Sequence, residues 1–167
     1  MKPFQRVALR YARQNKVRFV EANPTTSEGH RIEVVNKDGL VVGHIEGFLS
    51  YVYSRSALGF YECRKELEAL FDLWVDEVPS WDEEGVPIFE IDKTFLEADY
   101  RGMKIGIGMY KELASQVRRE VGAPMFFIPS YCGQGETSDM AKMVWESLTR
   151  SNLSEGDVIL MVKQDLR

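Results

Sequence analysis

The stretch from Tyr100 to Tyr110 constrains the fold of this chain most, because it is a glycine-rich turn between a strand-like and a helix-like segment. An alternating run from Ile88 to Leu96 precedes it, and helical periodicity from Lys111 to Glu120 follows it. At such a turn, unpaired backbone N–H groups and the helix dipole converge on one point. Glycines let a ligand approach the backbone closely. The sequence therefore predicts an anion-binding site at the start of this helix.

The turn resembles the acyl-CoA signature of the GNAT superfamily of N-acetyltransferases. That signature is an Arg or Gln, two residues, Gly, one residue, and then Gly or Ala. Arg101 matches its first position and Gly106 its last, and Gly108 fits the usual surroundings. Lys104 departs from the pattern, because it stands where the family usually has its first glycine. We expect no positive φ to be required there, and expect the lysine either to add charge beside a phosphate or to crowd the site.

The resemblance implies acetyl-CoA as the cosubstrate, with its pyrophosphate on the backbone N–H groups of the turn, and no metal. In the family, the strand before the signature pairs its free main-chain groups with the pantetheine arm like an added strand. The cofactor-binding residues implied in this way are Phe95, Leu96, Arg101, Gly102, Met103, Lys104, Ile105, Gly106, Ile107 and Ser138.

Transfer of an acetyl group to an amine needs a group that takes the proton of the amine. Glu90 lies eleven residues before Arg101, which is the spacing of the catalytic glutamate in histone-acetyltransferase-like members of the family. Partial burial beside aromatic side chains would strengthen this carboxylate as a base. We therefore predict Glu90 as the base, with Asp92 and Glu97 as alternatives. The competing interpretation is a strand face that simply contacts solvent.

The general acid for the departing thiolate is where the chain departs further from the family. Many members carry Asn-x-x-Ala-x-x-x-Tyr on the helix after the fifth strand, and here Ser138 and Trp145 replace the Asn and the Tyr. An indole N–H donates a hydrogen bond but does not protonate a thiolate at neutral pH, so we interpret Trp145 as a core or pocket-wall aromatic. We predict Tyr131 as the acid, with Cys132 or unassisted departure as alternatives.

Composition is typical of an ordinary globular protein, with 44% hydrophobic and 28% charged residues among 167. Two cysteines are too few for a disulfide framework, so a cytoplasmic location is expected. The apolar runs are too short to cross a membrane, and we expect no membrane partner. From Glu62 to Asp99, thirteen acids against three bases give a charge of −10, which argues against nucleic-acid binding. This acidic run is either a solvated face or a means of attracting a cationic acceptor.

The order of elements indicates one domain over residues 1–167, with no Gly-x-Gly-x-x-Gly of a Rossmann fold and no Walker-type Gly-Lys-Ser/Thr. It fits an α/β fold of the α+β type, GNAT-like, with a mixed, mostly antiparallel sheet flanked by helices. The expected segments are a basic amphipathic helix over 1–20 (or a transit peptide) with a short strand over 17–22, a hairpin of 31–36 and 40–53, a helical insertion over 61–78, strands over 87–96, 124–129 and 157–163, and helices over 104–121 and 137–150.

The function predicted is acetyl-CoA-dependent acetylation of a primary amine by direct attack on the thioester. The acceptor is a small molecule or a protein, and a homodimer is compatible with the sequence. The alternative is a non-catalytic acyl-CoA-binding or protein-interaction module on the same fold, favoured by Lys104, Ser138 and Trp145. His30 and His44 are isolated in the sequence, without a Cys or an acid at ligand spacing, so no metal site is expected.

Overall fold

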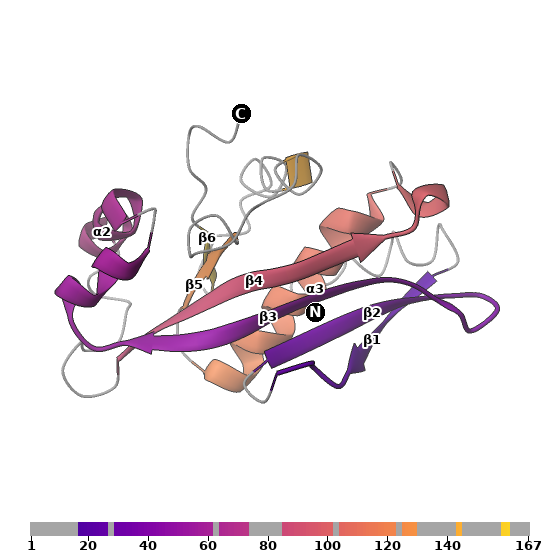
Figure 1. Ribbon diagram of the computed structural model, residues 1–167, viewed down its shortest axis with the longest axis horizontal. Helices are drawn as coiled ribbons and strands as arrows, with labels where there is room; N and C mark the ends of the chain where they lie inside the picture. Colours follow the sequence, from indigo (N-terminus) through magenta and orange to yellow (C-terminus); the bar gives the residue numbers. More distant parts are fainter. Residues whose placement is uncertain are drawn as a thin grey trace. The chain divides into compact units, whose positions relative to one another are not determined.

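A computed structural model describes residues 17–26, 29–61, 64–73, 85–101, 104–122, 125–129, 143–144 and 158–160. These residues form an α+β fold with a mixed six-stranded sheet in the order β1-β2-β3-β4-β5-β6 (Figure 1). The strands are β1 (Val17–Ala22), β2 (Gly29–Asn36), β3 (Val41–Val52), β4 (Val86–Leu96), β5 (Met125–Ile128) and β6 (Val158–Leu160). The helices are α2 (Arg64–Leu73) and α3 (Ile105–Val121), with the 3₁₀ turns η1 (Arg55–Phe60) and η2 (Ala98–Tyr100).

The chain forms two compact units, and the division passes through β3, β4 and α3. The hairpin unit comprises Met1–Phe48 and Asp92–Val117, and the second unit comprises Leu49–Ile91 and Arg118–Arg167. The hairpin unit therefore contains β1, β2, the first part of β3, the last part of β4, η2 and most of α3. The turn that precedes α3 lies wholly within it.

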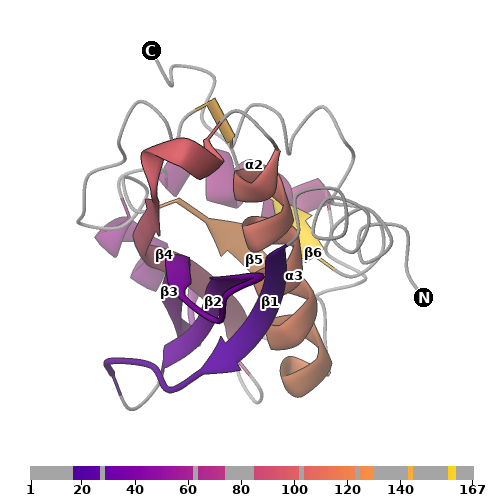
Figure 2. The same cartoon turned by 90° about the vertical axis from the view of Figure 1, so that its right-hand side faces the viewer.

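The hairpin unit is built on two antiparallel pairs. Strand β1 pairs with β2, and β2 pairs with β3 in a register that shifts between Val34 and Val35. Ile32, Val34 and Ile45 are almost fully buried. Helix α3 lies on one face of these strands (Figures 1 and 2) and buries a stripe at four-residue steps, which is the pattern of a helix packed along one side. That stripe consists of Ile105, Met109, Leu113 and Val117.

Strands β3 and β4 run antiparallel (Figure 1). They approach very closely at Gly43. The Glu97 N–H donates to the Val42 carbonyl at 2.9 Å. A Cβ at Gly43 would lie 2.7 Å from Leu96 Cδ1 and 2.9 Å from the Phe95 carbonyl oxygen. Because no side chain fits in that space, glycine at this position lets β4 lie flat against β3.

In the second unit β4, β5 and β6 are parallel. Ile88 to Glu90 on β4 pair with Phe126 to Ile128 on β5, and β6 continues in parallel on the far side of β5. The rings of Phe89 and Phe127 stack with centroids 5.6 Å apart. A parallel pair needs a long crossover, and the segment between β4 and β5 contains α3, as in a strand–helix–strand unit.

Most predicted elements in the described part of the chain are confirmed. The hairpin turns at Gly39 with φ +80°, and α3 ends at Gly122 with φ +69°, where the Gly122 N–H bonds to the Arg118 carbonyl. Strand β1 confirms the short strand predicted over 17–22. The predicted mixed sheet is present, with β1–β2, β2–β3 and β3–β4 antiparallel and β4–β5 and β5–β6 parallel.

One prediction needs correction, and two others extend beyond the described residues. Residues 17–20 of the proposed N-terminal helix are strand, because this alternating segment pairs along its length with β2; residues 1–16 lie outside the described residues. The helix predicted over 61–78 is confirmed as α2 over Arg64–Leu73, and it begins after Tyr61; residues 62–63 and 74–78 lie outside the described residues. The 3₁₀ turn η1 before it was not predicted. Nearly all of the helix predicted over 137–150 also lies outside the described residues. Among the helices that the structure does describe, none has the length and apolar character needed to cross a membrane.

Candidate anion-binding turn and polar sheet face

The turn between β4 and α3 is held by hydrogen bonds to its own strand and to the hairpin. Arg101 Nε donates to the Leu96 carbonyl at 2.8 Å, and the Arg101 N–H bonds to the Ala98 carbonyl at 3.1 Å. Asn36 Nδ2 donates to the Tyr100 hydroxyl at 3.2 Å. The residue that the signature places first, Arg101, therefore has a structural contact in this turn.

Lys104 adopts a left-handed backbone conformation, with φ +62°. Its carbonyl accepts the Gly108 N–H at 3.3 Å, so it stands immediately before the first turn of α3. The expectation that no positive φ is required there was wrong. The left-handed region strains residues with a Cβ by about 1–2 kcal/mol and suits glycine, which is the family's usual residue at this position of the signature.

The start of α3 has the features of an anion site. In an α-helix, the N–H groups of Ile105, Gly106 and Ile107 have no acceptor within the helix. The first turn contains no acidic residue that would repel an anion. Ile105 is fully buried, whereas Gly106 and Ile107 are half-buried. This end of the helix can therefore bind a phosphate through its backbone.

The remaining predicted site residues fall in different places. Phe95 is 48% exposed and Leu96 half-buried at the end of β4, in the hairpin unit with Arg101 and Lys104. Glu90 is half-buried on β4 and belongs to the second unit. The other predicted residues lie outside the described residues; they are Gly102, Met103, Tyr131 and Ser138.

A polar sheet face in the hairpin unit was missed by the sequence analysis. It is formed by Thr25, Arg31, Glu33, His44, Glu46 and Lys93. Its centre is Glu46, whose side chain is 1% exposed. The Thr25 N–H donates to Glu46 Oε1 at 2.9 Å, and the Thr25 hydroxyl donates to Oε2. Arg31 Nη1 lies 3.5 Å from Oε1, so the buried carboxylate is well satisfied.

The charge state of Glu46 follows from these contacts. Burial on its own raises the pKa of this carboxyl group. The two hydrogen bonds from Thr25, followed by the charges of Arg31 and Lys93, outweigh burial and bring the pKa below its usual value. Glu46 is therefore a carboxylate at neutral pH, and it holds the Thr25 loop on the sheet.

His44 lies directly opposite Glu33 in the register of β2 and β3, and its ring centroid is 5.8 Å from that of Phe95. Burial, followed by the charge of Arg31, lowers the pKa of His44, while Glu33 and Glu46 act in the opposite direction. The net shift is downward, so the imidazole is neutral at neutral pH.

His44, which is isolated in the sequence, therefore lies beside Glu33 and Phe95 in the folded sheet. Polar residues alternate along both hairpin strands, as Arg31 and Glu33 on β2 and as His44 and Glu46 on β3. This alternation was the available signal. Which of these polar residues lie opposite one another depends on the register of β2 and β3, and that register shifts between Val34 and Val35.

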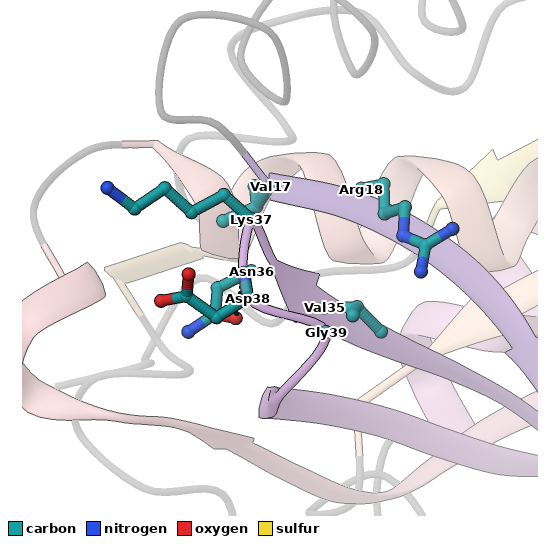
Figure 3. A pocket seen from close by; sticks show the side chains of 7 residues that line it. All are labelled: Val17, Arg18, Val35, Asn36, Lys37, Asp38 and Gly39. Carbon is teal, nitrogen blue, oxygen red and sulfur yellow. Dashed lines mark hydrogen bonds between the residues drawn. The ribbon is translucent and has the colours of Figure 1, made fainter.

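An open hollow of about 520 Å³ lies where the start of β1 meets the β2–β3 turn (Figure 3). Asn36 connects it to the anion-binding turn through Tyr100. Figure 3 shows the Arg18 and Lys37 side chains pointing away from one another, so their charges do not converge on one ligand position. The lining residues are Val17, Arg18, Val35, Asn36, Lys37, Asp38 and Gly39.

Helix α3 also buries polar side chains. Lys111 is 6% exposed, and burial lowers the pKa of its ammonium group. Gln116 is 8% exposed, and its Oε1 has no hydrogen-bond partner among the residues that the structure describes. The Gln116 oxygen, unpartnered within the described part of the chain, costs stability, because it is removed from water without a hydrogen bond in return. Burial of the Lys111 side chain disfavours its charged form.

No three His, Cys, Asp or Glu side chains in the described ranges gather closely enough to hold a metal ion. Comparison with known protein families finds no family that matches this sequence, and a search of curated proteins finds no relative.

Proposed function

We propose that this chain is an acetyl-CoA-dependent N-acetyltransferase with a GNAT-like fold, which transfers an acetyl group to a primary amine. The observation that carries the proposal is the left-handed backbone of Lys104 immediately before α3. A backbone conformation suited to glycine occurs at the signature position where the family has glycine. The strand–turn–helix order and the parallel β4–β5 pair support the same interpretation.

The described residues suggest how CoA would be held. The N–H groups of Ile105, Gly106 and Ile107 would bind the pyrophosphate, and the Lys104 side chain would either add charge or crowd it. The main chain of Phe95 and Leu96 would pair with the pantetheine arm. The Leu96 carbonyl already accepts from Arg101, but a carbonyl oxygen has a second lone pair and can accept again.

In the reaction that the resemblance implies, Glu90 takes a proton from the ammonium group of the acceptor. The amine nitrogen then attacks the thioester carbon, a C–N bond forms and the C–S bond breaks. The thiolate leaves with the bonding electron pair and is protonated by Tyr131. The second proton leaves the new amide nitrogen and restores the Tyr131 hydroxyl, and Glu90 passes its proton to water. The other product is the acetylated amine.

The test is a thermal unfolding measurement with and without CoA. At about one hundred times Kd, the ligand adds roughly 2.7 kcal/mol, which raises Tm by about 5–11 °C in a chain of this size. Pantetheine, which lacks the pyrophosphate, should give a much smaller shift. Gly106→Glu should abolish the CoA shift, because it places bulk and negative charge where the phosphate would lie. Absence of any shift at millimolar CoA would refute the proposal.

The alternative, an acyl-CoA-binding module without activity, is favoured by Lys104, Ser138 and Trp145. Titration of the thiol released from acetyl-CoA in the presence of a panel of primary amines separates the two functions. A transferase releases thiol only when an acceptor amine is present. A binding module shows the thermal shift without thiol release.

A further inference from the structure

Three side chains form a row across neighbouring strands of the hairpin unit. Glu33 on β2 lies opposite His44 on β3, and the His44 ring is 5.8 Å from that of Phe95 on β4. The Glu33 side chain is 27% exposed, His44 is half-buried, and Phe95 is 48% exposed. The row is therefore held by the sheet and is accessible to a ligand.

Each member of the row can interact with a different part of a cationic amine. Arg31 Nε and Nη2 both bond to Glu33 Oε2 at 3.2 Å, so Oε1 of this fixed carboxylate can accept from an ammonium group. Phe95 is 48% exposed, and an aromatic ring can contact a cation or an alkyl chain. The imidazole of His44 lies between the two and can accept a proton.

We propose that Glu33, His44 and Phe95 form the acceptor subsite of the proposed acetyltransferase, that it takes cationic primary amines with an apolar chain, and that His44, in place of Glu90, removes the proton. The inference rests on the proposed function. In this arrangement Phe95 would contact both substrates. Its main chain is the proposed partner of the pantetheine arm, and its ring lies beside His44 in the acceptor subsite.

The proton balance of the step is as follows. His44 takes one proton from the ammonium group and later passes it to water. The neutral amine attacks the thioester carbon, the C–N bond forms, and the C–S bond breaks with its electron pair leaving on sulfur. The second proton leaves the new amide nitrogen and ends on the thiolate. The products are an N-acetylated amine, CoA thiol and one proton.

The groups that act on His44 come from all three strands. They are Arg31 and Glu33 on β2, Glu46 on β3 and Lys93 on β4. Burial and the two cations outweigh the two carboxylates and lower the pKa of His44. The neutral imidazole predominates at neutral pH, and kcat/KM should fall as pH drops through the pKa of His44.

The decisive experiment measures kcat/KM against pH for phenethylamine and spermidine with the full chain. His44→Gln should retain the CoA thermal shift, lower kcat/KM at neutral pH by about 10²- to 10⁴-fold, and remove the acidic limb of the profile. His30→Gln, which changes the other histidine of the chain, should leave the profile unchanged. Glu33→Gln should raise KM for both amines by about two- to fivefold with kcat nearly unchanged.

The outcomes separate this inference from the proposed function. If His44→Gln keeps the acidic limb while Glu90→Gln loses it, the subsite is wrong and the transferase remains. If the wild-type chain neither binds CoA nor releases thiol, both proposals fail. Should His44→Gln not fold, His44→Ala supplied with free imidazole replaces it. Recovery of turnover by imidazole would support a proton-transfer role for His44. Lack of recovery, together with an unchanged KM in Glu33→Gln, would overturn the proposed subsite.

Discussion

Replacing Lys104 with glycine should make the protein more stable, although it removes a charged side chain from a surface turn. Lys104 is the one residue other than glycine with a positive φ in the described part of the chain, at +62°. In this region Cβ comes too close to the neighbouring carbonyl oxygen, and relief of that strain is worth about 1–2 kcal/mol. Glycine loses more conformational freedom on folding, which offsets roughly 0.5–1 kcal/mol of the gain. The net stabilisation expected is about 0.5–1 kcal/mol.

Two control variants isolate the backbone term. Lys104→Ala removes the long side chain but keeps Cβ, so it should not reproduce the gain. Gly122→Ala tests the same effect in the opposite direction, because Gly122 has φ +69° and a Cβ there would meet nothing within 4 Å. Its cost should therefore be purely conformational, about 1–2 kcal/mol of destabilisation.

Urea unfolding followed by circular dichroism measures all three variants, with differential scanning calorimetry as a second probe. The expected rise in Tm for Lys104→Gly is about 1–4 °C. If Lys104→Gly is no more stable than Lys104→Ala, the left-handed conformation does not strain the turn. CoA affinity in the same variant separates the two roles of the lysine: affinity falls if its ammonium contacts phosphate and rises if the side chain crowds the site.

Two further predictions concern buried charges. Glu46→Gln should lower the free energy of unfolding at neutral pH by about 1–3 kcal/mol, because it weakens the bonds from Thr25 and Arg31 in a buried place. Folding lowers the pKa of Glu46 from 4.5. The higher stability of the wild-type protein should therefore be present above pH 4.5 and disappear as pH falls through the folded-state pKa. A difference in unfolding free energy that does not change with pH in urea titrations would contradict this. Lys111→Met should stabilise by about 1 kcal/mol, because Lys111 is 6% exposed and burial disfavours the charged form of its ammonium group. The stability gained by Lys111→Met should shrink as pH rises toward 10.5, because in this range the unfolded wild-type chain holds more protons than the folded one. A Tm at pH 7 that is unchanged or lower in the variant would contradict the prediction.

Local chemistry was enough to predict the hairpin and α3. Asp38-Gly39 between two β-rich runs indicates a tight turn, and Gly122 after a periodic segment indicates a helix end. Residues 17–20 fit the pattern of a helix and that of a strand, because so short a segment does not distinguish the two periods. Pairing with β2, a tertiary contact, makes them strand.

The candidate site was predicted only in part. The anion-binding turn depends on neighbouring residues in the sequence, whereas the polar sheet face depends on how strands pair. The anion-binding turn is continuous in sequence, and its residues can be read directly. The polar sheet face joins Thr25, His44 and Lys93 from separate segments, and their meeting requires the registers of two strand pairs. The left-handed conformation of Lys104 was hidden for a different reason, since a lysine gives no local indication of a positive φ.

Asn36 has a consequence for the order in which this fold assembles. Its Oδ1 accepts the N–H groups of Asp38 and Leu40, contacts that need only a few residues to meet. Its Nδ2 donates to Tyr100, which is 64 residues away. Short loops close in well under a microsecond to a few microseconds, whereas distant contacts must first overcome a larger loop-closure entropy. The turn can thus form while the later strands are still unfolded. The Asn36 Nδ2 group is then already positioned to donate to the Tyr100 hydroxyl once β4 pairs with β3.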